Sequence, residues 1–185
     1  MVKNSEIFHG ELELIKNHKY RECTREILDE LVPDYFWVVA ASSSGKYHPW
    51  YSLGYGGLVR HTKAAFKIAV DLLGLKQYEA LDEDAVLVAI LLHDTFKHGL
   101  PPSPFTVGEH PIIAAENIRS YAHSHFDEEM AESFDFVADL IASHMGQWNK
   151  TRGGTEMPTP QTPDQKFVHL CDYLASRKYV IVEVQ

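Results

Sequence analysis

The chain has 185 residues, 45 % hydrophobic and 23 % charged, which suits one ordinary globular domain and argues against two. The formal net charge of −9 argues against a broad, non-specific nucleic-acid surface but allows a local basic pocket. No stretch reaches the roughly 20 apolar residues of a membrane span, and the N-terminus MVKNSEIFHGELELI lacks the apolar run of a signal peptide. We therefore expect a cytoplasmic protein with no membrane partner.

The first half of the chain predicts three helices. The spacing of apolar residues favours helices over 5–16 and 20–31, and Pro33 then begins PDYFWVVAAS, which fits either a helical turn or an extended piece. The Ser-, Gly- and Pro-rich stretch SSSGKYHPWYSLGYGG is typical of a loop. A helix follows from about Gly57 to Leu73.

The second half predicts four more helices. Asp82 can cap the first of them, which is apolar all round through AVLVAILLHD and should lie at the centre of the protein. After the Pro-rich loop GLPPSPFTVG, Pro111 suits the first turn of a helix that runs to about Tyr121. Two further helices are predicted over 127–145 and about 163–180, and the terminal VIVEV is either a helical extension or a short strand. The fold class is therefore all-α.

The sequence has few cysteines and many histidines. Cys23 and Cys171 fall in helix-like patterns, so we expect buried thiols and no disulfide framework. The count of 11 histidines is the unusual feature of the composition.

Several polar side chains fall where the helical pattern calls for apolar ones. Spacings of three and four put His61 on the apolar face of the 57–73 helix, and His144 ends the corresponding stripe of the 127–145 helix. A lone buried histidine is more often a satisfied core residue, but buried polar groups are costly without partners, and buried charges are normally paired or bound to metal. One shared site resolves that cost for the whole set: His61, His93, Asp94, His110, His144 and Asp172.

Four histidines and two aspartates indicate a metal site. Neutral imidazole and carboxylate suit zinc, iron, nickel, cobalt or manganese, and the lack of a cysteine ligand disfavours a structural zinc site. His93 and Asp94 are neighbours in the chain, and neighbouring side chains on a helix diverge by about 100°. The pair can therefore serve two ions about 3.5–4 Å apart, with the carboxylate as the bridge.

Five ordered motifs resemble those of the HD-domain superfamily of metal-dependent phosphohydrolases. They are GGLVRHT, LLHDTFKHG, GEHPIIAAE, IASHMGQW and VHLCDYLASRK. The resemblance covers residues 45–180 of a single domain over 1–185, and residues 1–44 are expected to form N-terminal helices that pack on this core. It implies a helical bundle of about six to eight helices.

The resemblance also implies roles for individual residues. One metal ion would be held by His61, His93, Asp94 and Asp172, and the second by Asp94, His110 and His144. Lys97 would lie close enough to contact a phosphate or donate a proton. Within the superfamily, the chain is similar to the HD module of bacterial 3′-to-5′ exoribonucleases and to small stand-alone HD proteins.

Further residues are candidates for binding the substrate, and each has a plainer alternative. His48, with Lys46 beside it, can contact a phosphate or can pack among the aromatic residues of its loop. Trp148 can stack on a base or can anchor its loop. Arg177 can fork onto a phosphate or can belong to a solvated helix end.

Together these features predict a metal-dependent phosphohydrolase in which metal-activated water attacks phosphorus in line. Asp94 and Lys97 are the expected catalytic residues, with Lys97 stabilising the developing negative charge. The expected substrate is a nucleotide or another small phosphorylated metabolite, as a monoester or a diester. Because a net charge of −9 repels such anions, a local basic cluster should offset it: Lys46, Arg60, Lys63 and Lys97.

Three alternatives stay open. The first is a 3′-5′ exonuclease or phosphodiesterase on short nucleic acid, the second an HD-type di-iron oxygenase, and the third a non-catalytic nucleotide sensor. The sequence predicts one or two divalent ions without choosing among Mn, Fe, Ni, Co and Zn. A homodimer is a base-rate expectation only.

Overall fold

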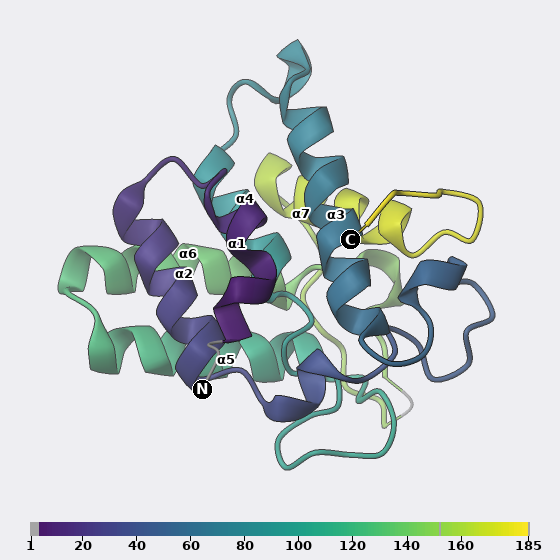
Figure 1. Ribbon diagram of the computed structural model, residues 1–185. Coiled ribbons are helices and arrows are strands. Elements are labelled where there is room, and N and C mark those ends of the chain that lie inside the picture. Colours follow the sequence, from purple (N-terminus) through teal and green to yellow (C-terminus); the bar gives the residue numbers. More distant parts are fainter. Residues whose placement is uncertain (1–3, 152, 185) are drawn as a thin grey trace.

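The computed structural model describes residues 4–151 and 153–184, which fold as a set of packed helices (Figure 1). Short 3-10 turns link the longer helices, and the described residues contain no β-strand, only an isolated bridge between Lys150 and Glu156. The all-α class is therefore confirmed. The α-helices are α1 (His9–Leu12), α2 (His18–Glu30), α3 (Gly57–Leu73), α4 (Glu83–Leu92), α5 (His110–His125), α6 (Glu128–Ala142) and α7 (Pro163–Ala175).

Helix α4 lies at the centre of the protein. Every residue from Ala85 to Leu92 is buried, because this helix has no polar face to turn toward water. It contacts α2, α3, α6 and α7. The Asp82 carboxylate accepts a hydrogen bond from Ala85 N at 3.1 Å and caps the helix, as the sequence predicts.

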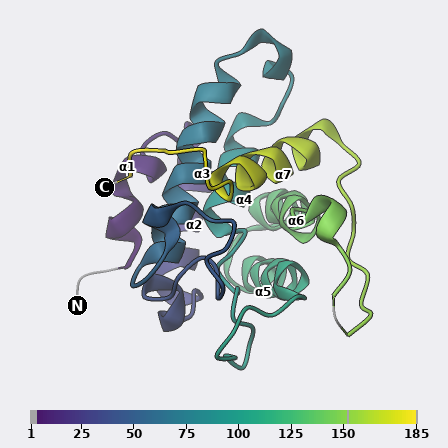
Figure 2. The same cartoon turned by 90° about the vertical axis from the view of Figure 1, so that its right-hand side faces the viewer.

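Helices α5 and α6 form a second layer beside α4. They pack along each other, and Figure 2 shows both nearly end on, with α7 beyond α6. The apolar stripe of α6 is buried against α4 and α5 through residues such as Phe134, Val137 and Ile141. Arg119 on α5 adds an ion pair across the exposed side, 2.7 Å from the Asp139 carboxylate.

The first predicted helix is broken by contacts with distant residues. In place of one helix over 5–16, the chain forms a 3-10 turn over Asn4–Phe8 and the single turn of α1. The backbone N–H groups of Lys16 and Asn17 donate to the Asp84 carboxylate at 2.7 and 2.9 Å, so the chain leaves the helix to reach the start of α4.

Several helices end earlier than their apolar patterns predict. Helix α4 ends at Leu92 and α6 at Ala142, so the polar residues expected inside these helices lie just after them. The predicted helix over 163–180 ends at Ala175, where the side chains of Ser176 and Arg177 both donate to Tyr173 O. Helix α5 instead extends beyond Tyr121 to His125.

The C-terminal VIVEV segment is neither of the predicted structures. It forms no helix or strand up to residue 184, and Val182 and Val184 pack against the core. Cys171 is buried as predicted, whereas Cys23 is only half-buried, and both thiols are free. None of the helices in the described part of the chain has the length and apolar character needed to cross a membrane.

Candidate functional site

The six polar residues predicted from the sequence to share a site lie together, each near one end of a helix. We call them the His/Asp cluster: His61 on α3, His93 and Asp94 after α4, His110 at the start of α5, His144 after α6 and Asp172 on α7. Five of them are at most 1 % exposed, and the Asp172 side chain is 18 % exposed. Five separate parts of the chain therefore supply polar groups to one buried position.

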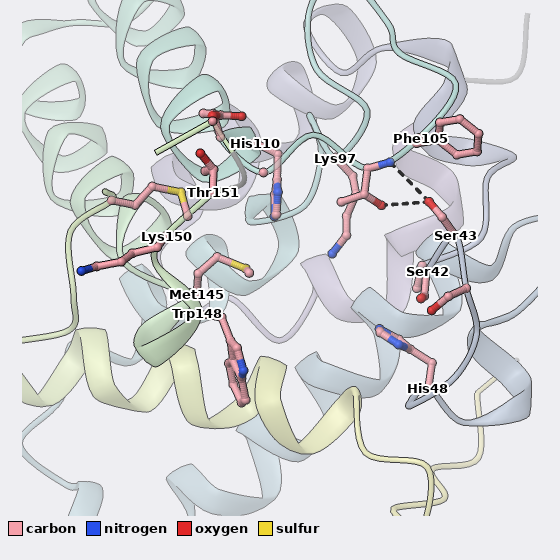
Figure 3. Close-up of a pocket in the computed structure, with 17 residues that line it drawn as sticks. Ser42, Ser43, His48, Lys97, Phe105, His110, Met145, Trp148, Lys150 and Thr151 are labelled. Atoms are coloured by element: carbon pink, nitrogen blue, oxygen red, sulfur yellow. Dashed lines mark hydrogen bonds between the residues drawn. The ribbon is translucent and has the colours of Figure 1, made fainter. Parts of the chain in front are cut away.

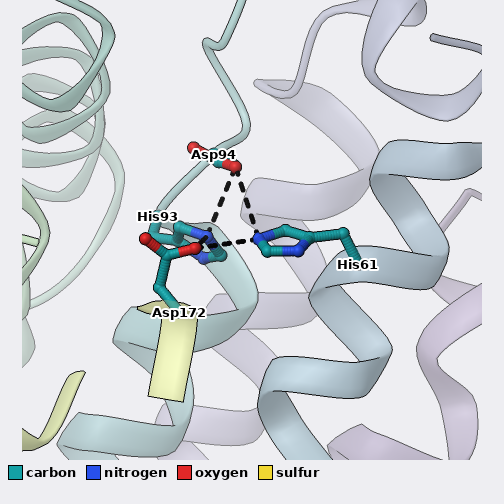
Figure 4. A group of neighbouring side chains, drawn as sticks. All are labelled: His61, His93, Asp94 and Asp172. Atoms are coloured by element: carbon teal, nitrogen blue, oxygen red, sulfur yellow. Dashed lines mark hydrogen bonds and ion pairs between the residues drawn. The ribbon is translucent and has the colours of Figure 1, made fainter. Parts of the chain in front are cut away.

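The first group within the cluster contains His61, His93, Asp94 and Asp172, and it is drawn in Figure 4. Asp172 Oδ1 lies 2.9 Å from His61 Nε2 and 3.6 Å from His93 Nε2. Asp94 Oδ2 lies 3.4 Å from His93 Nε2 and 3.8 Å from His61 Nε2. One ligand atom from each residue lies within 4.8 Å of all the others, so the group can hold a metal ion.

The second group contains Asp94, His110 and His144. The other carboxylate oxygen of Asp94, Oδ1, lies 3.0 Å from His110 Nε2 and 3.6 Å from His144 Nε2. The two histidine Nε2 atoms are 3.3 Å apart. Asp94 thus turns one oxygen to each group, and it belongs to both.

Backbone hydrogen bonds orient three of the histidines. The Nδ1 atom of each lies 2.7 Å from the carbonyl oxygen three residues earlier, so Nδ1 carries the hydrogen and Nε2 keeps a lone pair. A second partner that fixes the tautomer in this way is typical of metal-binding histidines. These pairs are His93 with Ile90, His110 with Val107, and His144 with Ile141.

In this orientation the Nε2 lone pairs of these histidines point toward carboxylate oxygens, which are also hydrogen-bond acceptors. The buried atoms His93 Nε2 and Asp94 Oδ1 have no hydrogen-bond partner, although each lies close to other cluster atoms. A lone pair that points at a carboxylate oxygen is unfavourable unless a positive charge lies between them. The donor set therefore fits a divalent cation.

Burial and neighbouring charges set the ionisation states of Asp94, Asp172 and His144. Burial alone would raise the pKa of Asp94, but the charges of Lys97 and His93 hold it well below its usual range. Burial likewise acts to raise the pKa of Asp172, but the hydrogen bond with His61 and the nearby His93 outweigh burial and hold this pKa well below its usual range. Burial lowers the pKa of His144 to about 4. The carboxylates are thus ionised and His144 is neutral, the forms that bind metal.

His93 shows what holds the first group together without a metal ion. Burial acts to lower its pKa, but the negative charges of Asp94 and Asp172 beside it raise the pKa to about 10. Either a proton or a metal ion must therefore lie at its Nε2 atom, and a metal ion that binds there displaces the proton.

The family model of the HD domain matches residues 58–177. The chain belongs to the HD domain family. All six residues of the His/Asp cluster lie inside the matched segment. No curated protein and no solved structure matches the chain. The similarity to exoribonuclease HD modules stays a prediction.

Lys97 lies at the edge of the cluster in this HD domain. Its Nζ atom is 2.6 Å from Asp94 Oδ2, three residues before it in the chain, and its side chain is 12 % exposed. The lysine also lines the pocket next to the cluster. It therefore joins the buried carboxylate of the HD domain to the space that a substrate can enter.

The pocket has a volume of about 710 Å³ and opens beside His110 and Lys97 (Figure 3). Besides Lys97, its lining residues come from three parts of the HD domain, within 41–48, 105–110, and 145–151 with 153–157. Of the predicted substrate-binding residues, His48 and Trp148 line it together with Lys97.

Two other predicted contacts lie outside this lining. The Arg177 guanidinium lies 4.4 Å from the centre of the Tyr173 ring and donates to Ser176 Oγ at 2.8 Å. Lys46 Nζ lies 5.1 Å from the centre of the Tyr47 ring. Neither of these cations is among the residues that line the pocket.

The predicted basic cluster does not form as a unit. Arg60 donates to the carbonyl oxygens of Tyr51 and Leu53, and Lys63 lies 3.5 Å from the Glu11 carboxylate. Only Lys97 of the four cations lines the pocket. The other three make contacts elsewhere, so among these four cations only Lys97 adds positive charge to the pocket, whose lining also contains Lys150.

Sequence reasoning missed several residues that line the pocket of the HD domain. No periodic pattern marks them, because they lie in turns and loops whose path is set by distant hydrogen bonds. The Pro-rich loop and the long loop after His144 were the available signals, and they locate the segments but not the side chains. The missed residues are Phe105, Thr106, Glu109, Met145, Lys150, Thr151 and Met157.

Proposed function

We propose that this HD domain is a metal-dependent phosphohydrolase that cleaves a phosphoester bond. The observation that supports this most directly is the shared Asp94 carboxylate, which turns one oxygen to each of two buried ligand groups next to an open pocket. Two ligand groups that share a carboxylate favour a two-metal site, the arrangement used by many phosphatases and nucleases.

Each ligand group is proposed to hold one divalent cation. His61, His93 and Asp172 would serve the first, His110 and His144 the second, and Asp94 both. Imidazole and carboxylate ligands suit manganese, iron, cobalt, nickel or zinc. A divalent ion held by these residues would supply a bound water with a pKa lowered to about 7 and a positive charge that polarises a phosphoryl oxygen.

Asp94 and Lys97 are proposed to be the catalytic residues of the chain. Asp94 is fully buried and ionised, so its negative charge holds the Lys97 ammonium at the boundary between cluster and pocket. A substrate phosphate in the pocket meets that ammonium where water is largely excluded, which strengthens their attraction. Lys97 then stabilises the negative charge that develops on the phosphoryl oxygens.

His48 is proposed to donate a hydrogen bond to the same phosphate. Its ring lies 5.9 Å from the ring of His61, centre to centre, and its Nδ1 atom is buried without a partner. Burial lowers the pKa of His48 to about 4, so the ring is neutral at physiological pH. A neutral imidazole with one unpaired nitrogen can satisfy it on a phosphate oxygen.

A metal-supplemented screen tests the function. Metal-free protein would receive Mn²⁺, Fe²⁺, Co²⁺, Ni²⁺ or Zn²⁺, and hydrolysis of p-nitrophenyl phosphate and bis(p-nitrophenyl) phosphate would be followed together with bound metal. We expect metal-dependent release of nitrophenol, lost in His93→Ala and Asp94→Ala. His123→Ala is the matched control, because His123 is exposed on α5 and pairs with Asp135 outside the site.

Two outcomes contradict the proposal. Hydrolysis that survives both His93→Ala and Asp94→Ala would show that the His/Asp cluster is not the reaction centre. Iron binding with oxygen consumption and no phosphoester turnover would favour the oxygenase alternative instead.

A further inference from the structure

The pocket has two walls of different chemistry, with the proposed phosphate position between them. From this arrangement we infer that the substrate is a phosphodiester with two unlike arms, one hydroxylated and one carrying a planar ring such as a nucleobase. This inference rests on the proposed function, since it takes the phosphorus to lie beside Lys97 and His110.

Lys97 and His110 lie at the middle of the pocket. Figure 3 shows them between Ser42, Ser43, His48 and Phe105 on one side and Met145, Trp148, Lys150 and Thr151 on the other. A phosphate held at this position therefore has pocket space on two sides rather than at the end of a single channel.

The first side carries four hydroxyl groups beside His48 and Phe105, and we call the residues that supply these hydroxyl groups the hydroxyl wall. Ser43 Oγ accepts a hydrogen bond from Thr106 N at 3.3 Å and lies 3.3 Å from Thr106 Oγ. These contacts tie the 41–48 segment to the Pro-rich loop, so the wall exists before a ligand binds. Its hydroxyl groups suit a sugar-like arm, and they are supplied by Ser42, Ser43, Ser44 and Thr106.

The second side carries three large apolar side chains beside Lys150 and Thr151, and we call Met145, Trp148 and Met157 the apolar wall. The Trp148 ring is stacked on Tyr173, with ring centres 5.6 Å apart and planes tilted by 12°, yet it remains 45 % exposed. Met157 is held by Asn149, which accepts from Met157 N at 2.8 Å and donates to Met157 O at 2.9 Å. A rigid indole with flexible thioethers beside it suits a planar ring.

Glu109 limits what the ring-bearing arm can carry. It lines the pocket together with Thr151, and a partly exposed glutamate is ionised at neutral pH. Lys150, which also lines the pocket, lies 3.6 Å from the Glu156 carboxylate. An ionised carboxylate here repels a second phosphate, so the arm on the apolar wall is a neutral nucleoside rather than a pyrophosphate.

The size of the pocket favours a diester over a monoester. A volume of about 710 Å³ lies within the roughly 300–1,000 Å³ of small-molecule sites and far exceeds the needs of a phosphate group. A monoester has one organic arm and would leave one preformed wall without a partner. In the diester reaction, a water oxygen bonds to phosphorus, one P–O ester bond breaks and the departing oxygen gains a proton. One diester and one water thus yield one monoester and one alcohol.

Kinetics with matched substrates test this inference. We would compare kcat/KM for thymidine 5′-(p-nitrophenyl) phosphate, a diester, and p-nitrophenyl phosphate, a monoester, on the metal-loaded full chain. We expect at least about a tenfold preference for the diester. A monoester that is cleaved as well as or better than the diester would overturn the inference while leaving the proposed function intact. If no phosphoester is cleaved with any of the five metals, the proposed function itself fails.

A binding measurement tests the apolar wall without turnover. We would titrate thymidine 5′-monophosphate and inorganic phosphate into the protein by calorimetry. Trp148→Ala should weaken binding of the nucleotide by about tenfold or more, because base–aromatic stacking contributes on that scale, and should leave inorganic phosphate unchanged. Trp148→Phe should restore most of the affinity.

The control variant is Trp50→Ala, an exposed tryptophan that is not among the residues that line the pocket. Equal nucleotide affinity in Trp148→Ala, Trp50→Ala and the unaltered chain would overturn the assignment of the apolar wall. Loss of inorganic phosphate binding along with the nucleotide would also overturn it, because the effect would then not belong to the ring.

Discussion

The His/Asp cluster and the two walls of the pocket adjoin each other, yet the fold holds them in different ways. Every residue of the cluster lies on an α-helix or within two residues of a helix end, and backbone carbonyls orient three of its four histidines. The hydroxyl and apolar walls lie in loops and short turns, the first held by a hydrogen bond to another loop and the second by hydrogen bonds within its own loop. The proposed chemistry thus rests on rigid helices, and the proposed substrate preference rests on loops.

This difference predicts separable effects. Changes in the cluster should abolish metal binding and turnover together. Changes in the walls should alter which ligand binds while leaving the metal ions in place. The following predictions test that separation, from the largest expected effect to the smallest.

The largest effect is expected for Asp94→Asn compared with Asp172→Asn. Asp94 belongs to both ligand groups and Asp172 to one, so the first change should remove nearly all bound metal and the second about half. Metal content can be measured by plasma mass spectrometry. Turnover of Asp94→Asn should fall by more than about 100-fold, because even the partners that support metal ligands typically cost ~10–100-fold. Equal metal content in the two variants would contradict the shared role of Asp94.

Metal binding should raise the thermal stability of the protein. Without metal, the buried atoms His93 Nε2 and Asp94 Oδ1 have no hydrogen-bond partner, and a cation that binds only the folded state would contact both. Mn²⁺ at ~100 times its Kd should stabilise the fold by about 2.7 kcal/mol, which corresponds to an increase in Tm of roughly 5–10 °C for a chain of this size. Differential scanning fluorimetry would measure it.

The walls should not contribute to this increase. Trp148→Ala should keep the full metal-induced change in Tm, and His144→Ala should lose much of it. An equal loss in both variants would show that the wall and the cluster are not separable.

A substitution at a glycine in the turn after α6 can change the loop that carries the apolar wall without changing a residue of the His/Asp cluster. Gly146 has a φ of +58°, and a Cβ atom there would collide with the His169 ring, which packs near Trp148. Gly146→Ala should lower the free energy of unfolding by about 2 kcal/mol, through left-handed backbone strain and overpacking. Urea denaturation would measure this loss.

Gly154→Ala is the matched control, because Gly154 has a φ of +86° and open space around its Cα. It should lose only the strain, about 1 kcal/mol. Nucleotide affinity should fall more in Gly146→Ala than in Gly154→Ala. The same loss of stability in both would argue that the contact with His169 does not hold this turn.

The smallest effect is expected at the start of α7, which carries Asp172. Thr162 Oγ1 accepts from Gln165 N at 3.2 Å, and the Gln165 side chain accepts in return from Thr162 N at 3.1 Å. Removing this capping box in Thr162→Ala should lower the unfolding free energy by about 1 kcal/mol. Metal content should stay unchanged, since Asp172 lies beyond the first turns of the helix. A loss of metal would show that helix capping controls the ligand position.

Much of the helical framework could be predicted because its causes are local. The all-apolar segment after Asp82 identified the central helix, and a histidine in an apolar stripe identified His61 as part of a buried polar site. The ends of helices were predicted less well. Helix α7 stops at Ala175 because Ser176 and Arg177 take up the Tyr173 carbonyl, a competition that apolar spacing does not record.

The roles of charged side chains were harder to predict than their presence. Arg177, Arg60 and Lys63 are all cations near the right motifs, but each is bound to a carbonyl, hydroxyl or carboxylate outside the pocket. A long side chain reaches many partners, and the choice among them depends on residues far apart in the chain. Lys97 differs because its partner, Asp94, lies only three residues before it in the chain.

By itself, the sequence determined the helical class, the central position of the 83–92 helix and the set of six residues that had to share one buried site. These follow from local causes: periodicity of apolar side chains, and the cost of burying polar groups without partners. Only the tertiary structure decided that Asp94 turns one oxygen to each ligand group and that two unlike walls flank Lys97 and His110. Those features depend on where loops cross in space, which hydrogen bonds between distant residues such as Ser43 and Thr106 determine.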